Sequence, residues 1–200
     1  MSDSLSRRKL ARAAARMAVA CRNILPPLVL MTDDERLIDP IAAARALPRG
    51  SMVIVRARQP AHRKRLAGAM MTIARERGLF VLIAGDAELA LKVGADGVHL
   101  PEARLGEASS LRARYRLIVT GAAHSLSALR KTAWLDAAIL SPVFATASHP
   151  GRSSLTPVRA AFIARAARLP VYALGGVTSA NAGRLSGFSG IAAIGALAVS

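Results

Sequence analysis

The chain has 200 residues, of which 52% are hydrophobic and 20% are charged, a balance that suits one domain with a large core. No run of about 18 uncharged apolar residues occurs, which excludes a membrane-spanning helix, and the single cysteine, Cys21, excludes an internal disulfide. The net charge is +16, but the basic residues are scattered and aromatic residues make up only 4%, which leaves little surface for stacking bases. We expect neither nucleic-acid nor membrane partners, and a cytoplasmic location.

The first predicted element is a basic helix from about Ser6 to Arg22. We assign residues 1–26 to this N-terminal helical segment and residues 27–200 to the domain that follows. The helix is expected to pack over the gap between the last and first strands, because an uncovered strand face would expose apolar surface. Cys21 lies on this helix, where a small buried side chain is expected.

Eight short apolar runs follow, separated by segments of helical period such as residues 61–77, 126–134 and 158–168. In chain order the runs are Leu28–Met31, Met52–Val55, Leu79–Ile83, Gly97–Leu100, Leu117–Val119, Ala137–Leu140, Val171–Leu174 and Gly190–Ile194. They are continuous rather than alternating, which is typical of parallel strands buried on both faces. The pattern predicts a single α/β domain, a (β/α)₈ TIM barrel, rather than a doubly wound sheet. An eighth helix is expected to be missing or very short.

In such barrels the functional groups lie in the loops after the strands. The loops after the seventh and eighth runs hold Gly175 with Gly176, and Ile194 with Gly195. Bare backbone amides at helix starts bind phosphate well, and barrels commonly hold a phosphate here. The alternative is that these glycines only permit tight turns.

The loop after the sixth run supplies two more candidates, Thr146 and Ser148. Their hydroxyl groups can donate hydrogen bonds to the same anion. Their alternative role is hydrogen bonding within a local turn.

Four segments in this order and spacing resemble one known family: Met31–Asp34, Ala95–Leu100, Pro142–Thr146 and Leu169–Val177. The family is that of thiamine phosphate synthases and TenI proteins, and the resemblance extends from about Leu28 to Leu197. It implies a TIM barrel of thiamin biosynthesis that binds a thiazole phosphate.

The synthase branch of the family joins a pyrimidine diphosphate to thiazole phosphate and needs magnesium. At the positions of its magnesium ligands this chain has Gly85 and Arg104, whereas a hard divalent ion needs oxygen ligands. Asp33, Asp86 or Glu102 could supply a rearranged site, although Asp86 also reads as a helix N-cap. No cofactor is therefore expected, and Mg²⁺ is required only if the synthase alternative holds.

The TenI branch matches better, because it shares Arg56-Ala57-Arg58, Leu100-Pro101 and His124-Ser125-Leu126. The resemblance implies that His124 moves a proton, which needs a group titrating near neutrality and no metal. The alternative for His124 is a cap of the next helix.

The resemblance also gives roles to the remaining polar candidates. Arg56 and Arg58 would hold the carboxylate or phosphate of the substrate. As alternating residues they share a face only as far as the strand continues, so we expect only one of them to reach the site. His149 would cover the ligand phosphate where synthases carry lysine, and His99 reads as a core histidine.

The leading prediction is a metal-independent isomerase similar to the thiazole tautomerases. The first alternative is a thiamine phosphate synthase (thiamine-phosphate diphosphorylase), a transferase. The second is a non-catalytic thiazole-phosphate binding or regulatory protein. The sequence does not determine the oligomeric state, and a homo-oligomer is one of the states it allows.

Overall fold

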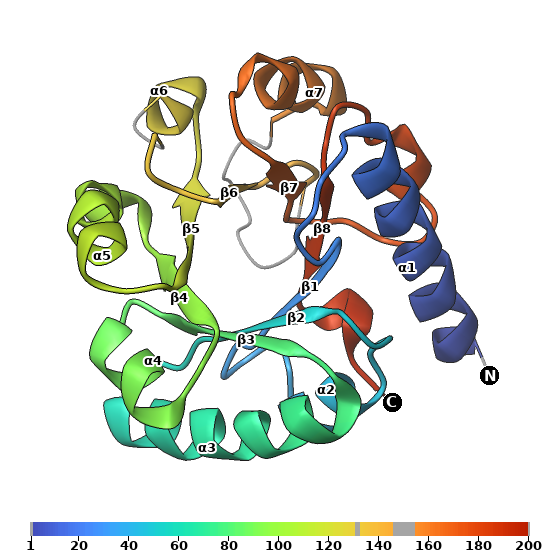
Figure 1. Ribbon diagram of the computed structural model, residues 1–200. Coiled ribbons are helices and arrows are strands. Elements are labelled where there is room, and N and C mark those ends of the chain that lie inside the picture. Colours follow the sequence, from blue (N-terminus) through green and yellow to red (C-terminus); the bar gives the residue numbers. More distant parts are fainter. Residues whose placement is uncertain (1, 131–132, 146–154, 200) are drawn as a thin grey trace.

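A computed structural model describes residues 2–130, 133–145 and 155–199. Eight parallel strands form a closed barrel in which each strand pairs with the next and β8 pairs with β1, as Figure 1 shows. The strands are β1 (Leu28–Met31), β2 (Met52–Val55), β3 (Phe80–Ala84), β4 (Gly97–Leu100), β5 (Ile118–Ala123), β6 (Ala137–Leu140), β7 (Val171–Ala173) and β8 (Gly190–Ala193). The predicted TIM barrel is confirmed.

The strands are buried on both faces, as their continuous apolar sequences predict. Val53, Ile54 and Leu82 are fully buried between the barrel interior and the outer helices. The outer layer consists of α2 (Pro40–Arg45), α3 (Pro60–Arg77), α4 (Ala87–Val93), α5 (Ala108–Arg114), α6 (Leu126–Leu129) and α7 (Pro157–Ala166), with the 3₁₀ turn η1 (Glu102–Glu107) before α5.

Local sequence explains where several of these helices begin and end. α3 starts at Pro60, which is preorganised for a first helical position, and ends at Gly78 in the left-handed conformation. α4 begins after Asp86, whose carboxylate accepts a hydrogen bond from the Leu89 N–H at 2.9 Å. The N-cap reading of Asp86 is therefore confirmed.

The outer helical layer is sparse around β7 and β8. Within the described residues, only the single turn η2 (Ala182–Arg184) connects β7 to β8, and only η3 (Gly195–Leu197) follows β8. The expectation of a missing or very short eighth helix is confirmed, while the shortness of the preceding connection was not anticipated.

Helix α1 (Ser2–Ala20) packs beside β8 and β1, as Figure 1 shows. Leu10, Ala13 and Ala14 of this helix are buried in the main core, and Arg7 Nη1 donates a hydrogen bond to the Ala198 carbonyl at 3.0 Å. The N-terminal helix thus packs where it was expected, over the junction of the last and first strands, which are paired with each other. The prediction of a buried Cys21 is wrong, because α1 ends one residue earlier and Cys21 is exposed.

Truncation of Leu10 tests the contribution of α1 to stability. Leu10 is 1% exposed and Leu5 of the same helix is 56% exposed. We expect Leu10→Ala to lower the free energy of unfolding by about 2–5 kcal/mol through loss of buried contacts and a residual cavity. Leu5→Ala should change it by no more than about 0.5 kcal/mol. Urea denaturation measures both, and equal effects would contradict the packing described.

His99 on β4 is buried inside the barrel, and its Nδ1 lies 2.9 Å from the Thr120 hydroxyl on β5. Burial lowers the pKa of His99 to about 4, with a further contribution from the positive charge of Arg56. The reading of His99 as a core histidine is confirmed, and this side chain is neutral at pH 7.

The buried imidazole makes stability depend on pH. Below its ordinary pKa of about 6.5 the unfolded chain binds a proton at His99, whereas the folded protein binds it only near pH 4. The stabilisation from a neutral His99 is therefore complete above about pH 6.5 and is lost as pH falls towards 4. We expect His99→Gln to flatten the dependence of the urea midpoint on pH between these values. His62→Gln, which removes an exposed histidine, should keep the wild-type slope.

Candidate functional site

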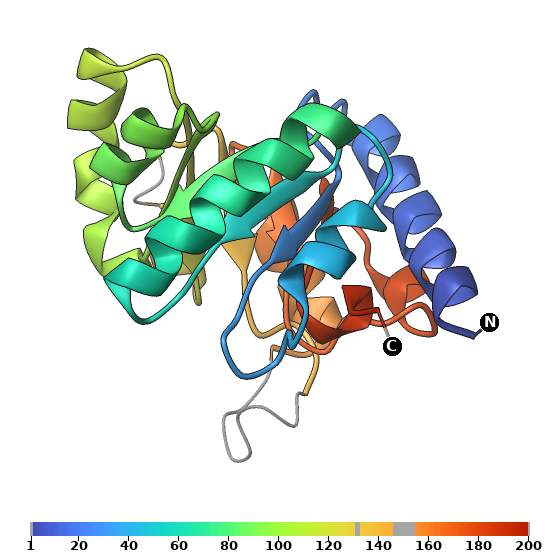
Figure 2. The same cartoon turned by 90° about the horizontal axis from the view of Figure 1, so that it is seen from below.

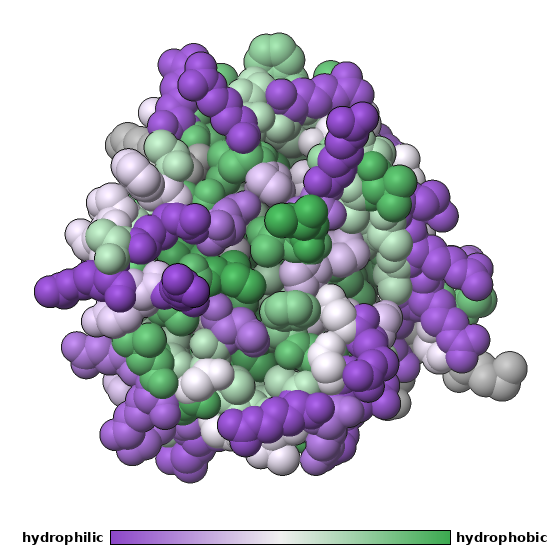
Figure 3. Space-filling model, viewed as in Figure 1, coloured by the Kyte–Doolittle hydropathy of each residue, from purple (hydrophilic) through white to green (hydrophobic). Residues whose placement is uncertain are grey.

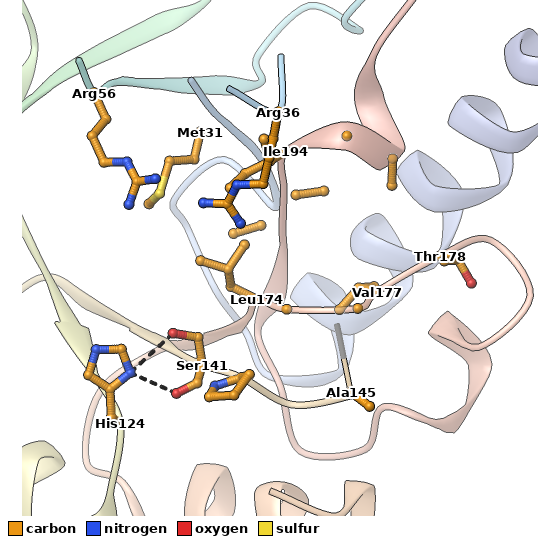
Figure 4. A pocket seen from close by; sticks show the side chains of 17 residues that line it. Met31, Arg36, Arg56, His124, Ser141, Ala145, Leu174, Val177, Thr178 and Ile194 are labelled. Carbon is orange, nitrogen blue, oxygen red and sulfur yellow. Dashed lines mark hydrogen bonds between the residues drawn. The ribbon is translucent and has the colours of Figure 1, made fainter. Parts of the chain in front are cut away.

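A cavity of about 770 Å³ opens at the carboxyl ends of the strands (Figure 4). Its apolar floor includes Met31, Leu174 and Ala193, and its polar groups come from the loops after β1, β2, β5, β6, β7 and β8. Figure 2 shows that the loop after β1 and the segment after β8 lie at the same end of the barrel. Residues far apart in sequence therefore meet at one site.

One wall of the cavity presents free backbone donors. Gly176, Val177, Gly195 and Ala196 all line it, and within the described part of the chain their N–H groups donate no hydrogen bond. Gly195 and Ala196 begin η3, and the first N–H groups of a helix have no partner inside it. Ile194 precedes them and also lines the cavity. This wall can accept an anion such as a phosphate.

The predicted helix start at Gly175 and Gly176 is wrong. Both residues have positive φ, 96° and 64°, and form a turn rather than a helix N-terminus. A Cβ on Gly176 would lie 2.5 Å from the Ala145 carbonyl oxygen, so the loop after β7 packs too closely on the loop after β6 for any side chain. These glycines have a structural role in addition to lining the cavity.

Gly195 allows a clean test of this wall. A Cβ there would meet only the Arg36 carbonyl oxygen, at 3.8 Å, so we expect Gly195→Ala to fold normally. Its methyl group would keep a phosphate oxygen from the N–H groups and weaken binding of a phosphorylated ligand about tenfold. Calorimetric titration measures this, with Gly183→Ala as control, since that position has open space outside the cavity. Unchanged affinity would argue against an anion at Gly195.

His124 follows β5 directly and lines the cavity. Its backbone N–H donates a hydrogen bond to Glu102 Oε2 at 2.7 Å, and the following helix α6 is capped by Ser125, whose hydroxyl accepts from the Ala128 N–H. His124 is therefore not the cap of that helix.

The ring orientation of His124 determines which nitrogen can carry out chemistry. Nδ1 lies 2.8 Å from the Ser141 carbonyl oxygen and 3.3 Å from the Ser141 hydroxyl (Figure 4). A carbonyl oxygen only accepts hydrogen bonds, so Nδ1 carries the proton in the neutral ring and Nε2 has the free lone pair. This arrangement makes Nε2 a proton acceptor.

Two guanidinium groups reach the cavity from the loops after β1 and β2. Arg36 and Arg56 line it, and both pair with the carboxylate of Asp33. The Thr32 hydroxyl accepts a hydrogen bond from the Arg56 N–H at 2.7 Å and donates one to the Arg56 carbonyl at 2.8 Å, which fixes the end of β2. The guanidinium groups give this side of the cavity a positive charge.

Arg58 is not brought into the cavity. Its guanidinium pairs with Glu35 at 2.7 Å and its side chain is 78% exposed, while its N–H donates to Asp34 Oδ2. Only one arginine of the Arg56/Arg58 pair therefore reaches the cavity. The other predicted contacts, Thr146, Ser148 and His149, lie outside the described residues.

Sequence reasoning missed three polar residues that line the cavity: Arg36, Ser141 and Thr178. Arg36 stands in a polar segment, Asp33-Asp34-Glu35-Arg36, that reads as a solvated loop. The only sequence feature that pointed to Arg36 was its position in the loop after the first predicted strand. Ser141 contributes mainly through its backbone carbonyl, which no residue type reveals.

The residues at the magnesium positions implied by the synthase branch do not fit a divalent ion. Arg104 Nη1 donates to the Gly85 carbonyl at 2.8 Å, and the same guanidinium holds Glu107 with two hydrogen bonds. Within the described residues, no three His, Cys, Asp or Glu side chains are grouped so that they could hold a metal ion. A fixed positive charge thus takes the place where oxygen ligands are needed.

The basic charge is distributed rather than gathered. Arg45 pairs with Glu76 and Arg112 with Asp136, on different sides of the barrel, and Figure 3 shows hydrophilic residues spread around the rim of one face. In the described ranges no helix is both long and apolar enough to cross a bilayer.

The fold and the cavity define a class of protein: TIM barrels with a polar cavity at the carboxyl ends of their strands. Residues 28–197 match the family model described as thiamine monophosphate synthase, TMP-TENI. The chain belongs to this family, as the sequence resemblance predicted.

Individual relatives agree with this assignment. The chain is 34% identical over 184 residues to a thiamine-phosphate synthase of Chlorobium luteolum, which covers 86% of this chain and 85% of the relative. It is 34% identical over 116 residues to a putative thiamine-phosphate synthase 2 of Aquifex aeolicus, covering 57% of this chain and 62% of that relative, less than two thirds of its length.

Solved structures share the fold. A thiamine phosphate pyrophosphorylase from Pyrococcus furiosus matches with a TM-score of 0.69 over 87% of each chain at 23% identity. FabK from Thermotoga maritima matches with a TM-score of 0.62 at 17% identity, over 92% of this chain and 61% of that chain. At these identities the likeness shows the barrel architecture alone.

Proposed function

We propose that this member of the thiamine monophosphate synthase family binds a thiazole phosphate and catalyses a metal-independent proton transfer, as a thiazole tautomerase does. The observation that carries the proposal is the bond from His124 Nδ1 to the Ser141 carbonyl, because it leaves Nε2 as a base at the cavity. The free N–H groups beside Gly176 and Gly195 support a phosphate opposite that base.

Each part of the cavity has a task in this reaction. The N–H groups of the loops after β7 and β8 hold the phosphate, and the guanidinium of Arg56 holds a second anionic group. Nε2 of His124 accepts a proton from a ring carbon while the C–H electron pair moves into the ring. The imidazolium then returns the proton to another atom of the same conjugated system, so the reaction is an isomerisation with no other reactant.

Replacement of His124 tests the proposed base. We expect His124→Gln to lower kcat by roughly 10²–10⁴-fold, as for loss of a general acid–base group, with KM nearly unchanged. The conversion of the thiazole carboxylate phosphate tautomer, followed by absorbance or NMR, measures this. His62→Gln, at an exposed helix start, is the matched control and should keep full activity. Wild-type turnover by His124→Gln would refute the role of His124.

The relatives favour a second candidate function, thiamine phosphate synthase, because their names state that activity. The comparisons support this alternative better than the tautomerase, whereas Gly85 and Arg104 oppose a magnesium-dependent form of it. Two incubations separate the alternatives: one with pyrimidine diphosphate and thiazole phosphate across a series of divalent metals, and one with the thiazole carboxylate phosphate tautomer without metal. Thiamine phosphate as product would establish the synthase, while isomerisation without metal would establish the tautomerase. Binding of thiazole phosphate without either product would indicate a non-catalytic protein.

A further inference from the structure

We infer that the outer face of helix α1 is a docking surface for an acidic amphipathic helix of another protein. This outer face consists of the exposed residues Leu5, Arg8, Arg12, Arg16 and Val19. None of these residues lines the cavity, so the inference does not depend on the proposed reaction. Helix α1 also precedes residues 28–197, which match the family model, so this surface is not part of the barrel that the family shares.

Helix α1 has two faces of different character. Leu10, Ala13 and Ala14 are buried in the main core, and they attach the inner face to the barrel. Figures 1 and 2 both show α1 at the periphery of the molecule, with no other described element beyond it. The fold thus buries one face of α1 and leaves the opposite face uncovered.

The exposed positions follow a seven-residue repeat. Leu5, Arg12 and Val19 are seven residues apart, and Arg8 and Arg16 lie on the turns between them. Such a repeat places side chains on one stripe along a helix, the arrangement through which paired helices pack. Leu5 is 56% exposed and Val19 is 81% exposed, so the stripe is apolar at both ends and basic in the middle. A polar residue at one central position of such a stripe fixes the register of two paired helices.

The cations of the outer face are not neutralised by the described part of the chain. Arg8, Arg12 and Arg16 take part in no ion pair and no side-chain hydrogen bond there, because all seven ion pairs lie within residues 33–136. Residues 1–27 contain six basic residues and one acidic residue. Like charges four residues apart repel each other and weaken a helix. An anionic partner would remove this repulsion, so the outer face is suited to one.

The pattern favours a protein helix over other anionic partners. The forked guanidinium groups match carboxylates, but they match phosphates as well, so the apolar ends of the stripe decide. A phosphate backbone offers no apolar group to Leu5 and Val19. A helix lying in a membrane surface presents a wide apolar face to the lipid, whereas α1 has turned that face towards the barrel. An acidic amphipathic helix supplies both carboxylates and apolar side chains.

A second copy of this chain does not supply those carboxylates. Eleven of the twelve acidic residues follow residue 32. All of these except Glu88 already accept a hydrogen bond or an ion pair within the chain. Self-association through the outer face would have to break such contacts, and the partner is therefore a different protein.

A designed peptide tests the surface. The probe is a three-heptad synthetic helix with leucine along one stripe and glutamate beside it, and its counterpart has lysine in place of glutamate. We expect the wild-type chain to bind the glutamate peptide and not the lysine peptide in fluorescence anisotropy. Arg12→Glu should weaken binding at least about tenfold, because it replaces an attraction by a repulsion. Arg75→Glu, the same charge change at an exposed position of α3, should weaken it less than about twofold, because solvent and salt screen distant charges.

The apolar part of the surface has its own variant. Val19→Ser should weaken the glutamate peptide about three- to tenfold through loss of buried apolar area. Val158→Ser is the matched control, because Val158 is 80% exposed on α7, and it should leave the affinity unchanged. Arg16→Glu provides a second charge variant, and urea midpoints verify that each variant is folded.

Four results would overturn the inference. One is a wild-type chain that does not bind the glutamate peptide. Another is an equal loss of affinity in Arg12→Glu and Arg75→Glu, which would show diffuse attraction between charges rather than a defined surface. A third is an affinity that Val19→Ser leaves unchanged, which would exclude packing of a helix along the stripe. The fourth is tighter binding of a single-stranded oligonucleotide or of phosphatidylglycerol vesicles than of the peptide, lost in Arg12→Glu, which would assign the stripe to a nucleic acid or a membrane surface.

Discussion

The pairing of β8 with β1 is the constraint on which the whole site depends. It joins Leu28–Leu30 to Ile191–Ala193, closes the sheet and brings the loop after the first strand against the segment after the last. The Arg36 carbonyl and Gly195 are neighbours for this reason. Without closure, the proposed anion-binding wall and the arginines would belong to opposite edges of an open sheet.

The site separates its charges by using different kinds of donor. The backbone N–H groups after β7 and β8 need no side chain and leave the cavity open. The arginines after β1 and β2 are held by the carboxylate of Asp33, whose pKa lies well below its usual range. The orientation of the His124 ring is set by an uncharged group, the carbonyl of Ser141. An imidazole oriented in this way suits a base that must take up and release a proton in one cycle.

The barrel could be predicted because its strands are continuous apolar runs, a local property that the folded environment does not alter. The details of the site could not, because they depend on contacts between distant segments. The turn at Gly176 is set by its approach to Ala145, and Arg36 acquires a role only when the barrel closes. His124 and Arg56 were found because each follows a strand directly and lies in a segment that resembles the TenI branch.

Helix α1 reaches the far end of the chain through the bond from Arg7 to the Ala198 carbonyl. Ala198 immediately follows η3, the turn that carries two of the free N–H groups. An anion held by those N–H groups would therefore contact the same short segment that helix α1 holds in place. Helix α1 thus supports, from outside the barrel, the segment that follows β8.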